Sequence, residues 1–146
     1  MTTNNNLIID NKSDRQINGE LIFSAYIDII NGENVGEKNI VNLIITDDVE
    51  IEILNFKYRG LKKVTDVLSF SDDCKVSSML GDIIIDIYQA ERQKKDSLDL
   101  ELQVLFVHGM LHLLGYDHLS TKDYNIMLQK EEYYNKMLRS KNQSGG

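Results

Sequence analysis

Three histidines near the C-terminal end of the chain are the residues best suited to chemistry. They are the only histidines of the sequence, and all lie in FVHGMLHLLGYDH, residues 106–118. His108 and His112 are four residues apart, so on a helix they share one face. Gly115 permits the left-handed conformation that ends a helix, and the turn after it can bring His118 toward the same point. Three imidazoles with a fourth position open are typical of a catalytic zinc site, with other divalent transition metals as alternatives.

The surroundings of the histidine pair favour a metal over chance clustering. The predicted helix is apolar on almost every side, which is typical of a buried helix. An unpaired imidazole in such a place costs about 1–3 kcal/mol of desolvation. A bound metal ion removes this cost.

The histidine spacing also matches that of the metzincin proteases, in which a glutamate after the first histidine acts as general base. Gly109 occupies that position in this chain. A peptidase at this site would lack its usual proton acceptor, so a zinc peptidase with an unusual base stays as an alternative.

The rest of the sequence predicts a small α/β fold that positions the histidines. Strands are expected at about 7–9, 40–45, 67–70 and 81–87, and helices at about 17–31, 47–58, 88–95, 96–115 and 120–139. Asp47 and Ser120 begin capping-box patterns, and Ser97 lies where a helix start favours a side-chain oxygen. The strand at 40–45 is almost continuously apolar, as expected of a strand that is covered on both faces.

Length and composition predict one domain, residues 7–140, with 1–6 and 141–146 as disordered tails. The chain has 146 residues, of which 42% are hydrophobic, enough for one core. It shows no secretory signal and no apolar run near the ~20 residues that span a bilayer. The single cysteine, Cys74, cannot form an internal disulfide, which suits a reducing compartment. We therefore expect a soluble, cytoplasmic protein.

A short basic strip interrupts an acidic sequence. The net charge of −7 argues against a general nucleic-acid binder, but four positive residues follow closely with no acid among them: Lys57, Arg59, Lys62 and Lys63. Such a strip on an acidic body can hold a phosphate backbone at one place. An ordinary solvated loop is the competing interpretation. The position of the strip, one loop before the strand at 67–70, favours RNA over peptide as partner.

Three stretches of the sequence resemble the signature motifs of the YbeY family. They are LNFKYRGLKKVTDVLSFS at 54–71, LGDIII at 80–85 and HGMLHLLGYDH at 108–118. The likeness extends from about Asn42 to Leu138. Val64 and Ser71 stand where the family usually has proline, a departure that would alter loop stiffness rather than chemistry.

The resemblance implies both a fold and an activity. The fold would be a mostly parallel four-stranded sheet (α/β, of α+β type) with one antiparallel strand, flanked by about five helices. His108, His112 and His118 would be the zinc ligands, and Arg59 the arginine of the cleft. The activity would be single-strand-specific, metal-dependent endoribonuclease cleavage in rRNA maturation, at the 3′ end of the small-subunit 16S rRNA, and in ribosome quality control. The implied partners are the small ribosomal subunit and an assembly GTPase.

The residues also indicate how such a site would work. A metal on three imidazoles lowers the pKa of its water toward ~7 and polarises a phosphoryl oxygen. Arg59 can pair with the phosphate and stabilise charge in the transition state. Four aspartates are candidates for the proton acceptor or for capping and orienting roles: Asp66, Asp82, Asp86 and Asp117. Attack by water and attack by the RNA 2′-hydroxyl both stay open, and a non-catalytic ribosome assembly factor with a structural metal is a further alternative.

Overall fold

The computed structural model describes the backbone of residues 6–144 and the side chains of residues 6–138. The elements follow one another as β1 (Leu7–Asn11), α1 (Gly19–Gly32), β2 (Ile40–Thr46), α2 (Asp48–Arg59), β3 (Val67–Ser71), β4 (Met79–Asp86), α3 (Ile87–Gln93), α4 (Leu98–Leu113) and α5 (Thr121–Ser144). The four strands form one sheet in the order β1-β2-β4-β3. β1, β2 and β4 are parallel, and β3 is antiparallel to β4. The predicted fold class is confirmed.

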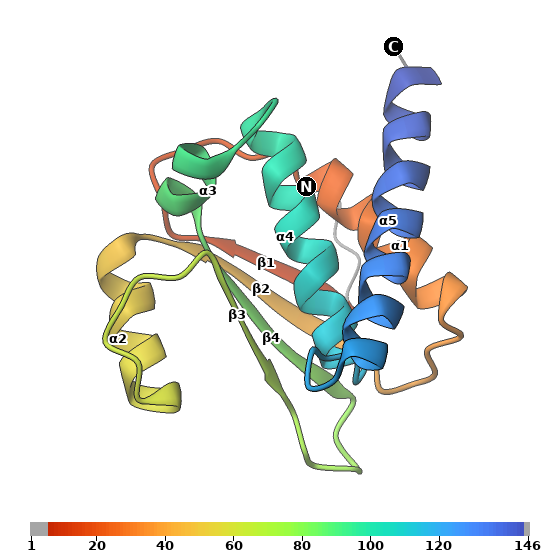
Figure 1. The fold of residues 1–146 in the computed structure, drawn as a ribbon, viewed down its shortest axis with the longest axis horizontal. Helices are drawn as coiled ribbons and strands as arrows, with labels where there is room; N and C mark the ends of the chain where they lie inside the picture. Colours follow the sequence, from red (N-terminus) through yellow and green to blue (C-terminus); the bar gives the residue numbers. More distant parts are fainter. Residues whose placement is uncertain (1–5, 145–146) are drawn as a thin grey trace.

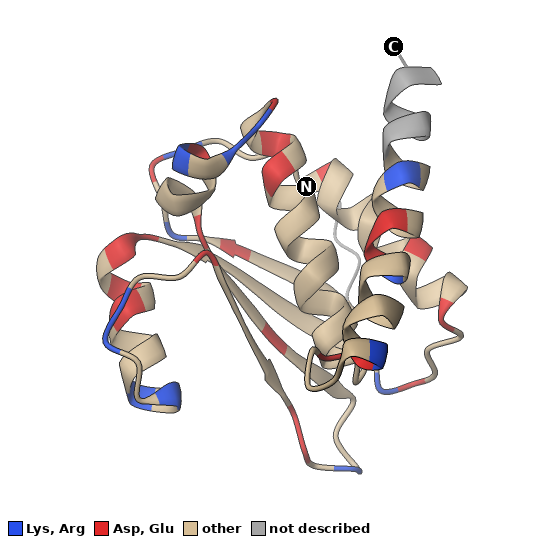
Figure 2. Ribbon diagram, viewed as in Figure 1, with Lys and Arg blue, Asp and Glu red and all other residues tan. Residues whose placement is uncertain are grey.

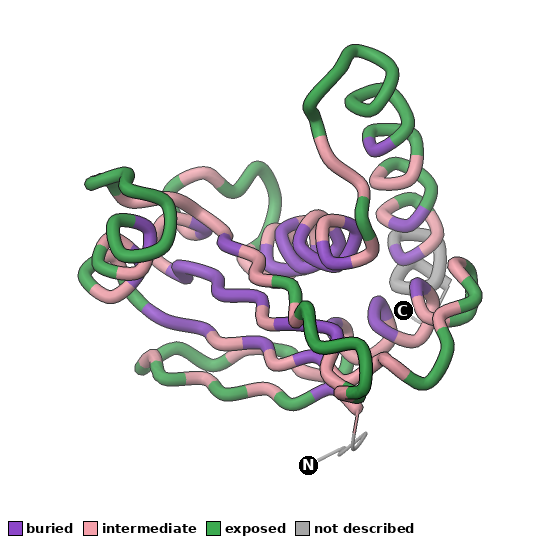
Figure 3. The backbone as a smooth tube through the Cα atoms, turned by 90° about the horizontal axis from the view of Figure 1, so that it is seen from below, coloured by how far each residue is buried: buried purple, intermediate pink, exposed green. Residues whose placement is uncertain are grey.

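The two faces of the sheet are covered unequally (Figure 1). α1, α4 and α5 form a layer on one face, where they enclose the main core with side chains such as Leu43, Ile83 and Ile85. Among the described helices, α2 is the one that covers the other face, where it packs through Ile51 against Leu68 and Ile84. Because successive strand residues point to opposite faces, β4 contributes to both clusters. Buried positions accordingly follow the strands and the helix packed on them (Figure 3).

α4 is the helix that carries the histidine pair, and it lies very close to β4. Its first turn is capped by Ser97, whose Oγ accepts from the Leu100 N–H at 3.2 Å. A Cβ placed on Gly109 would come within 2.8 Å of Ile83 Cγ2, so a larger residue would have to displace the Ile83 side chain. The helix ends at Leu113, and Gly115 follows with φ +100°. The predicted glycine turn is confirmed.

Element boundaries differ from prediction mainly at two places. Ile87 begins α3 rather than ending β4, because Asp86 caps that helix by accepting from the Tyr88 N–H at 3.0 Å. α5 extends to Ser144, beyond its predicted end near 139. The disorder expected for residues 1–5 and 145–146 lies outside the described residues, and the domain limits 7–140 stay a prediction. Within the part of the chain that is described, no helix is both long and apolar enough to cross a membrane.

Candidate metal centre

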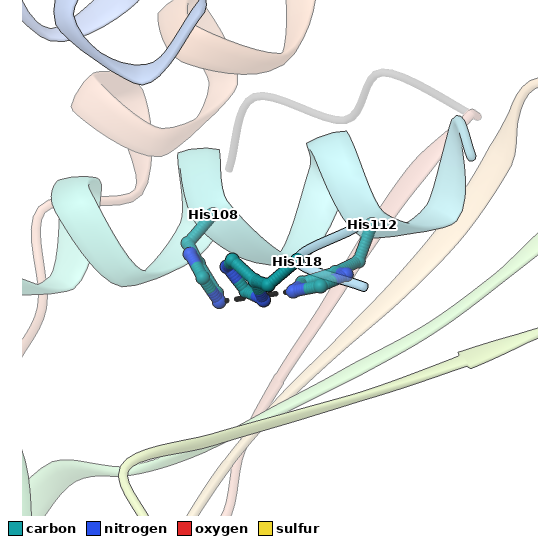
Figure 4. A group of neighbouring side chains, drawn as sticks. All are labelled: His108, His112 and His118. Carbon is teal, nitrogen blue, oxygen red and sulfur yellow. Dashed lines mark hydrogen bonds between the residues drawn. The ribbon is translucent and has the colours of Figure 1, made fainter. Parts of the chain in front are cut away.

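The three histidines come together at the C-terminal end of α4 (Figure 4). Each offers one ring nitrogen, and these three nitrogens lie within 4.8 Å of one another. His108 Nε2 and His112 Nε2 are 3.1 Å apart. Zinc–nitrogen bonds are about 2.0–2.1 Å long, so nitrogens at this spacing can converge on one ion after small side-chain rotations. The cluster could therefore hold a metal ion, and it is the only such group of three among the described residues.

Local structure explains why the third histidine reaches the other two. The pair lies one helical turn apart on α4, and the chain reverses direction at Gly115. Asp117 Oδ1 then accepts from the Leu119 N–H at 3.0 Å, which fixes the turn that contains His118. Asp117 thus holds the loop by a backbone contact.

The electrostatics of the cluster keep His112 neutral. Burial, followed by the neighbouring His108 and His118, lowers the pKa of His112 to about 4, and the charge of Arg59 contributes in the same direction. A neutral imidazole is the form that binds a metal ion. At neutral pH His112 is therefore ready to act as a ligand.

Glu131 of α5 contacts the cluster from outside, and it is a site residue that we did not predict from the sequence. Its Oε1 lies 2.6 Å from His108 Nδ1. The contact joins residues 23 positions apart, so no local sequence motif indicates it. One signal was present: Glu131 falls in the helical stripe of Met127, Tyr134 and Leu138, all of which are buried. An acid on a core-facing stripe requires a polar partner.

Glu33, at the end of α1, anchors the loop that carries His118. Its carboxylate accepts from the hydroxyls of Tyr116 and Tyr134, each at 2.5 Å, and from Lys130 Nζ at 3.1 Å. Burial alone would raise the pKa of Glu33, but these hydrogen bonds and the Lys130 charge outweigh it and lower the pKa. One ionised carboxylate therefore joins α1, the histidine loop and α5. The sequence pattern gave no sign of this anchor either.

The other three aspartates that are candidate proton acceptors all have partners other than the histidines. Asp66 accepts from Gln93 Nε2 at 2.9 Å, and Asp82 accepts from Asn42 Nδ2 at 3.0 Å. Asp86 caps α3. These contacts are structural, as capping and orienting roles require.

The basic strip lies at the C-terminal end of α2 and on the following loop, where blue gathers in Figure 2. Gly60 ends the helix with φ +71°, and the buried Asn55 side chain donates to the Lys63 carbonyl at 3.0 Å, which folds the loop back. All four basic side chains of the strip are exposed. Across the described residues, the Arg59 guanidinium forms no hydrogen bond or ion pair. It forms no hydrogen bond with the histidines, although its charge helps to lower the pKa of His112.

The position of Gly109 argues against the peptidase alternative. A side chain there would point at Ile83 of β4, since its Cβ would already lie within 2.8 Å of that residue. A glutamate would press into the sheet instead of reaching toward the ring nitrogens. The metzincin-like interpretation is therefore not favoured.

Comparison with known proteins agrees with the motifs. The sequence profile of the family described as "Endoribonuclease YbeY" matches residues 7–139. Relatives of that name include one from Desulforamulus reducens, 44% identical over 63% of this chain and 67% of its own, and one from Clostridioides difficile, 36% identical over 87% and 92%. The solution structure of TM1509 from Thermotoga maritima is similar, with a TM-score of 0.64 and 26% identity over 95% of this chain and 93% of that one. The chain belongs to the endoribonuclease YbeY family.

Proposed function

We propose that this protein is a zinc-dependent endoribonuclease that cleaves single-stranded RNA. The observation that carries the proposal is the convergence of three imidazole nitrogens within 4.8 Å, in a chain that belongs to this family. His108, His112 and His118 are the proposed ligands. An all-imidazole set suits zinc, and three protein ligands leave a position for substrate or water. When bound, zinc supplies a Lewis acid that polarises a phosphoryl oxygen and acidifies water.

Arg59 is proposed to bind the scissile phosphate. Its guanidinium is exposed and has no carboxylate partner within the described residues, so it is available to an incoming anion. Its influence on the pKa of His112 supports a position within electrostatic range of the cluster. A planar guanidinium can pair with two phosphate oxygens and stabilise the charge that develops on them. The neighbouring lysines of the strip would hold adjacent phosphates.

The cellular role proposed here follows the family. It comprises maturation of the 3′ end of 16S rRNA and ribosome quality control, with the small ribosomal subunit and an assembly GTPase as partners. Such a role places the protein in the cytoplasm.

Cleavage of a labelled single-stranded RNA by zinc-loaded protein, beside the His112→Ala variant, tests the activity. We expect cleavage by the first protein and none by the second, with the same RNA in duplex form as the substrate control. Equal cleavage by both proteins would indicate a contaminating nuclease. No cleavage by either would overturn the nuclease proposal and favour the assembly-factor alternative.

A further inference from the structure

We propose that Glu131 is a positioning residue for the metal site. It accepts the Nδ1 hydrogen of His108 and thereby directs the Nε2 lone pair of that ring toward the ion. The inference rests on the proposed metal site and adds a residue from a different helix, α5, to its construction.

The hydrogen-bonding capacity of the two groups indicates which ring nitrogen of His108 carries the hydrogen. A carboxylate oxygen without a hydrogen can only accept, so the 2.6 Å contact between Glu131 Oε1 and His108 Nδ1 suits the ring tautomer that has its hydrogen on Nδ1. A neutral imidazole then has its lone pair on Nε2. Nε2 is also the nitrogen that faces His112, at 3.1 Å from His112 Nε2. The carboxylate thus selects the tautomer that presents a ligand atom to the centre of the cluster.

The same geometry separates Glu131 from the ligands themselves. Nδ1 and Nε2 lie at different edges of the imidazole, so a carboxylate on Nδ1 is behind the ring when seen from the ion. A carboxylate that binds the far side of a histidine ligand orients that ligand and increases its basicity. It also follows that Glu131 is not placed to take a proton from a group that reacts at the ion.

Two features make the contact strong and reproducible. The side chains of His108 and Glu131 are only 28% and 22% exposed, so water competes weakly for the hydrogen bond. The rotation of α5 is set by Lys130 and Tyr134, which both bind Glu33. Because these two residues flank Glu131 within one helical turn, the Glu33 anchor also fixes the direction from which Glu131 approaches.

Glu132 provides a matched control, since it is the next residue of α5 and is exposed. We would prepare Glu131→Ala, Glu131→Gln, Glu132→Ala and Glu132→Gln in the full chain and measure zinc affinity by competition with a chromogenic chelator. We expect a loss of about 10–100-fold for Glu131→Ala, the range typical for such orienting carboxylates. Glu131→Gln should lose less, because its amide oxygen still accepts a hydrogen bond, and the Glu132 variants should match wild type.

A spectroscopic measurement separates positioning from a general effect on folding. Imidazole ¹⁵N spectra of the zinc-free protein should show the Nδ1–H tautomer of His108 in wild type and in the Glu132 variants, and a mixture of tautomers in Glu131→Ala. Unchanged zinc affinity, or an unchanged His108 tautomer, in a folded Glu131→Ala would overturn the inference. If that variant does not fold, equal affinities of Glu131→Gln and Glu132→Gln would overturn it instead.

These measurements do not depend on RNA cleavage. Weaker zinc binding by the Glu131 variants in a protein that cleaves no RNA would retain this inference and remove the proposed function. RNA cleavage by a protein whose zinc affinity does not change in the Glu131 variants would retain the proposed function and remove this inference.

Discussion

The histidine cluster and the basic strip (Lys57, Arg59, Lys62 and Lys63) differ in how firmly the rest of the molecule holds their side chains. His108 is bonded to Glu131, and the loop of His118 is tied to α1 through Tyr116 and Glu33. In the strip, the backbone is held rather than the side chains: the Asn55 side chain donates a hydrogen bond to the Lys63 carbonyl. Metal ligands must be fixed to a fraction of an ångström, whereas a phosphate backbone is attracted by charge that can remain mobile. The two regions therefore suit two different tasks.

Metal removal should have the largest effect, because it acts on the ordered region. We expect a chelator to abolish RNA cleavage and to lower the melting temperature, since an ion that binds only the folded state stabilises that state. Zinc added back should restore both. Calorimetry and a cleavage assay on the same sample provide the measurement, and cleavage that survives complete zinc removal would contradict the proposed metal site.

Arg59→Glu should separate the two regions most clearly. We expect a loss of cleavage of about 100-fold or more, because the guanidinium is replaced by a group that repels phosphate. Zinc content should stay at the wild-type level, since Arg59 is not one of the three proposed ligands. Metal analysis beside the cleavage assay tests both expectations, with Arg59→Lys as the charge-conserving control. Normal cleavage by Arg59→Glu would remove this residue from the mechanism.

Glu33→Gln tests whether the anchor is part of the ordered region. The amide cannot accept from both tyrosines and Lys130 as the carboxylate does, so we expect a loss of about 1–3 kcal/mol in the free energy of unfolding. Zinc affinity should also fall, because the His118 loop and α5 both depend on Glu33. Urea unfolding is the measurement, and Glu37→Gln, at an exposed position, is the control. Identical unfolding midpoints for the two variants would show that the anchor has no energetic role.

The N-terminal end of α2, opposite the basic strip, is held by charged groups, and we expect them to make the stability of the fold depend on pH. Arg92 pairs with Asp48 at 2.7 Å, and burial together with Asp48 raises the pKa of Asp86 to about 7. The folded state thus holds a proton that the unfolded state has released, so stability should fall as pH rises from about 4 to about 7. Asp86→Asn should remove about 1–2 kcal/mol of this loss and still cap α3.

Unfolding curves of wild type and Asp86→Asn at pH 5 and pH 8 check this expectation. The variant should gain stability relative to wild type only at the higher pH. Asp47→Asn, at the exposed N-cap of α2, is the matched control and should keep the wild-type pH dependence. If the stability of Asp86→Asn changed with pH as much as that of wild type, another group would be responsible for the pH dependence.

The smallest effect is expected for the lysines of the strip. Lys62→Ala and Lys63→Ala should each weaken RNA binding only a few-fold and reduce the salt slope of binding by about 0.7, the value for one contact with a single strand. Zinc content should not change. Fluorescence anisotropy at several salt concentrations measures the slope, with Lys75→Ala, in the exposed loop between β3 and β4, as control. A salt slope equal to that of Lys75→Ala would show that Lys62 and Lys63 do not contact the RNA phosphates.

Most of the fold was predictable because its signals are local. Asp47, Ser97 and Ser120 cap helices as expected, each by accepting a backbone hydrogen bond from three residues ahead. The histidine cluster was predictable for the same reason, since its members lie within eleven residues of one another. Glu33 and Glu131 were not, because their partners are brought near only by the packing of helices distant in sequence. Asp117 shows the same difficulty: its loop-fixing bond to Leu119 is indistinguishable in sequence from an orienting contact to a histidine.

The contact between α5 and the histidines has a consequence for biosynthesis. A chain is made and folds from its N-terminal side, so all three histidines leave the ribosome before the helix that orients His108. A nascent chain would contain every ligand yet lack the contacts of Glu131, Lys130 and Tyr134 that position them. On this account, competence to bind metal tightly arrives only with α5. For an enzyme proposed to cut ribosomal RNA, the delay would keep the unfinished protein harmless to the ribosome that is making it.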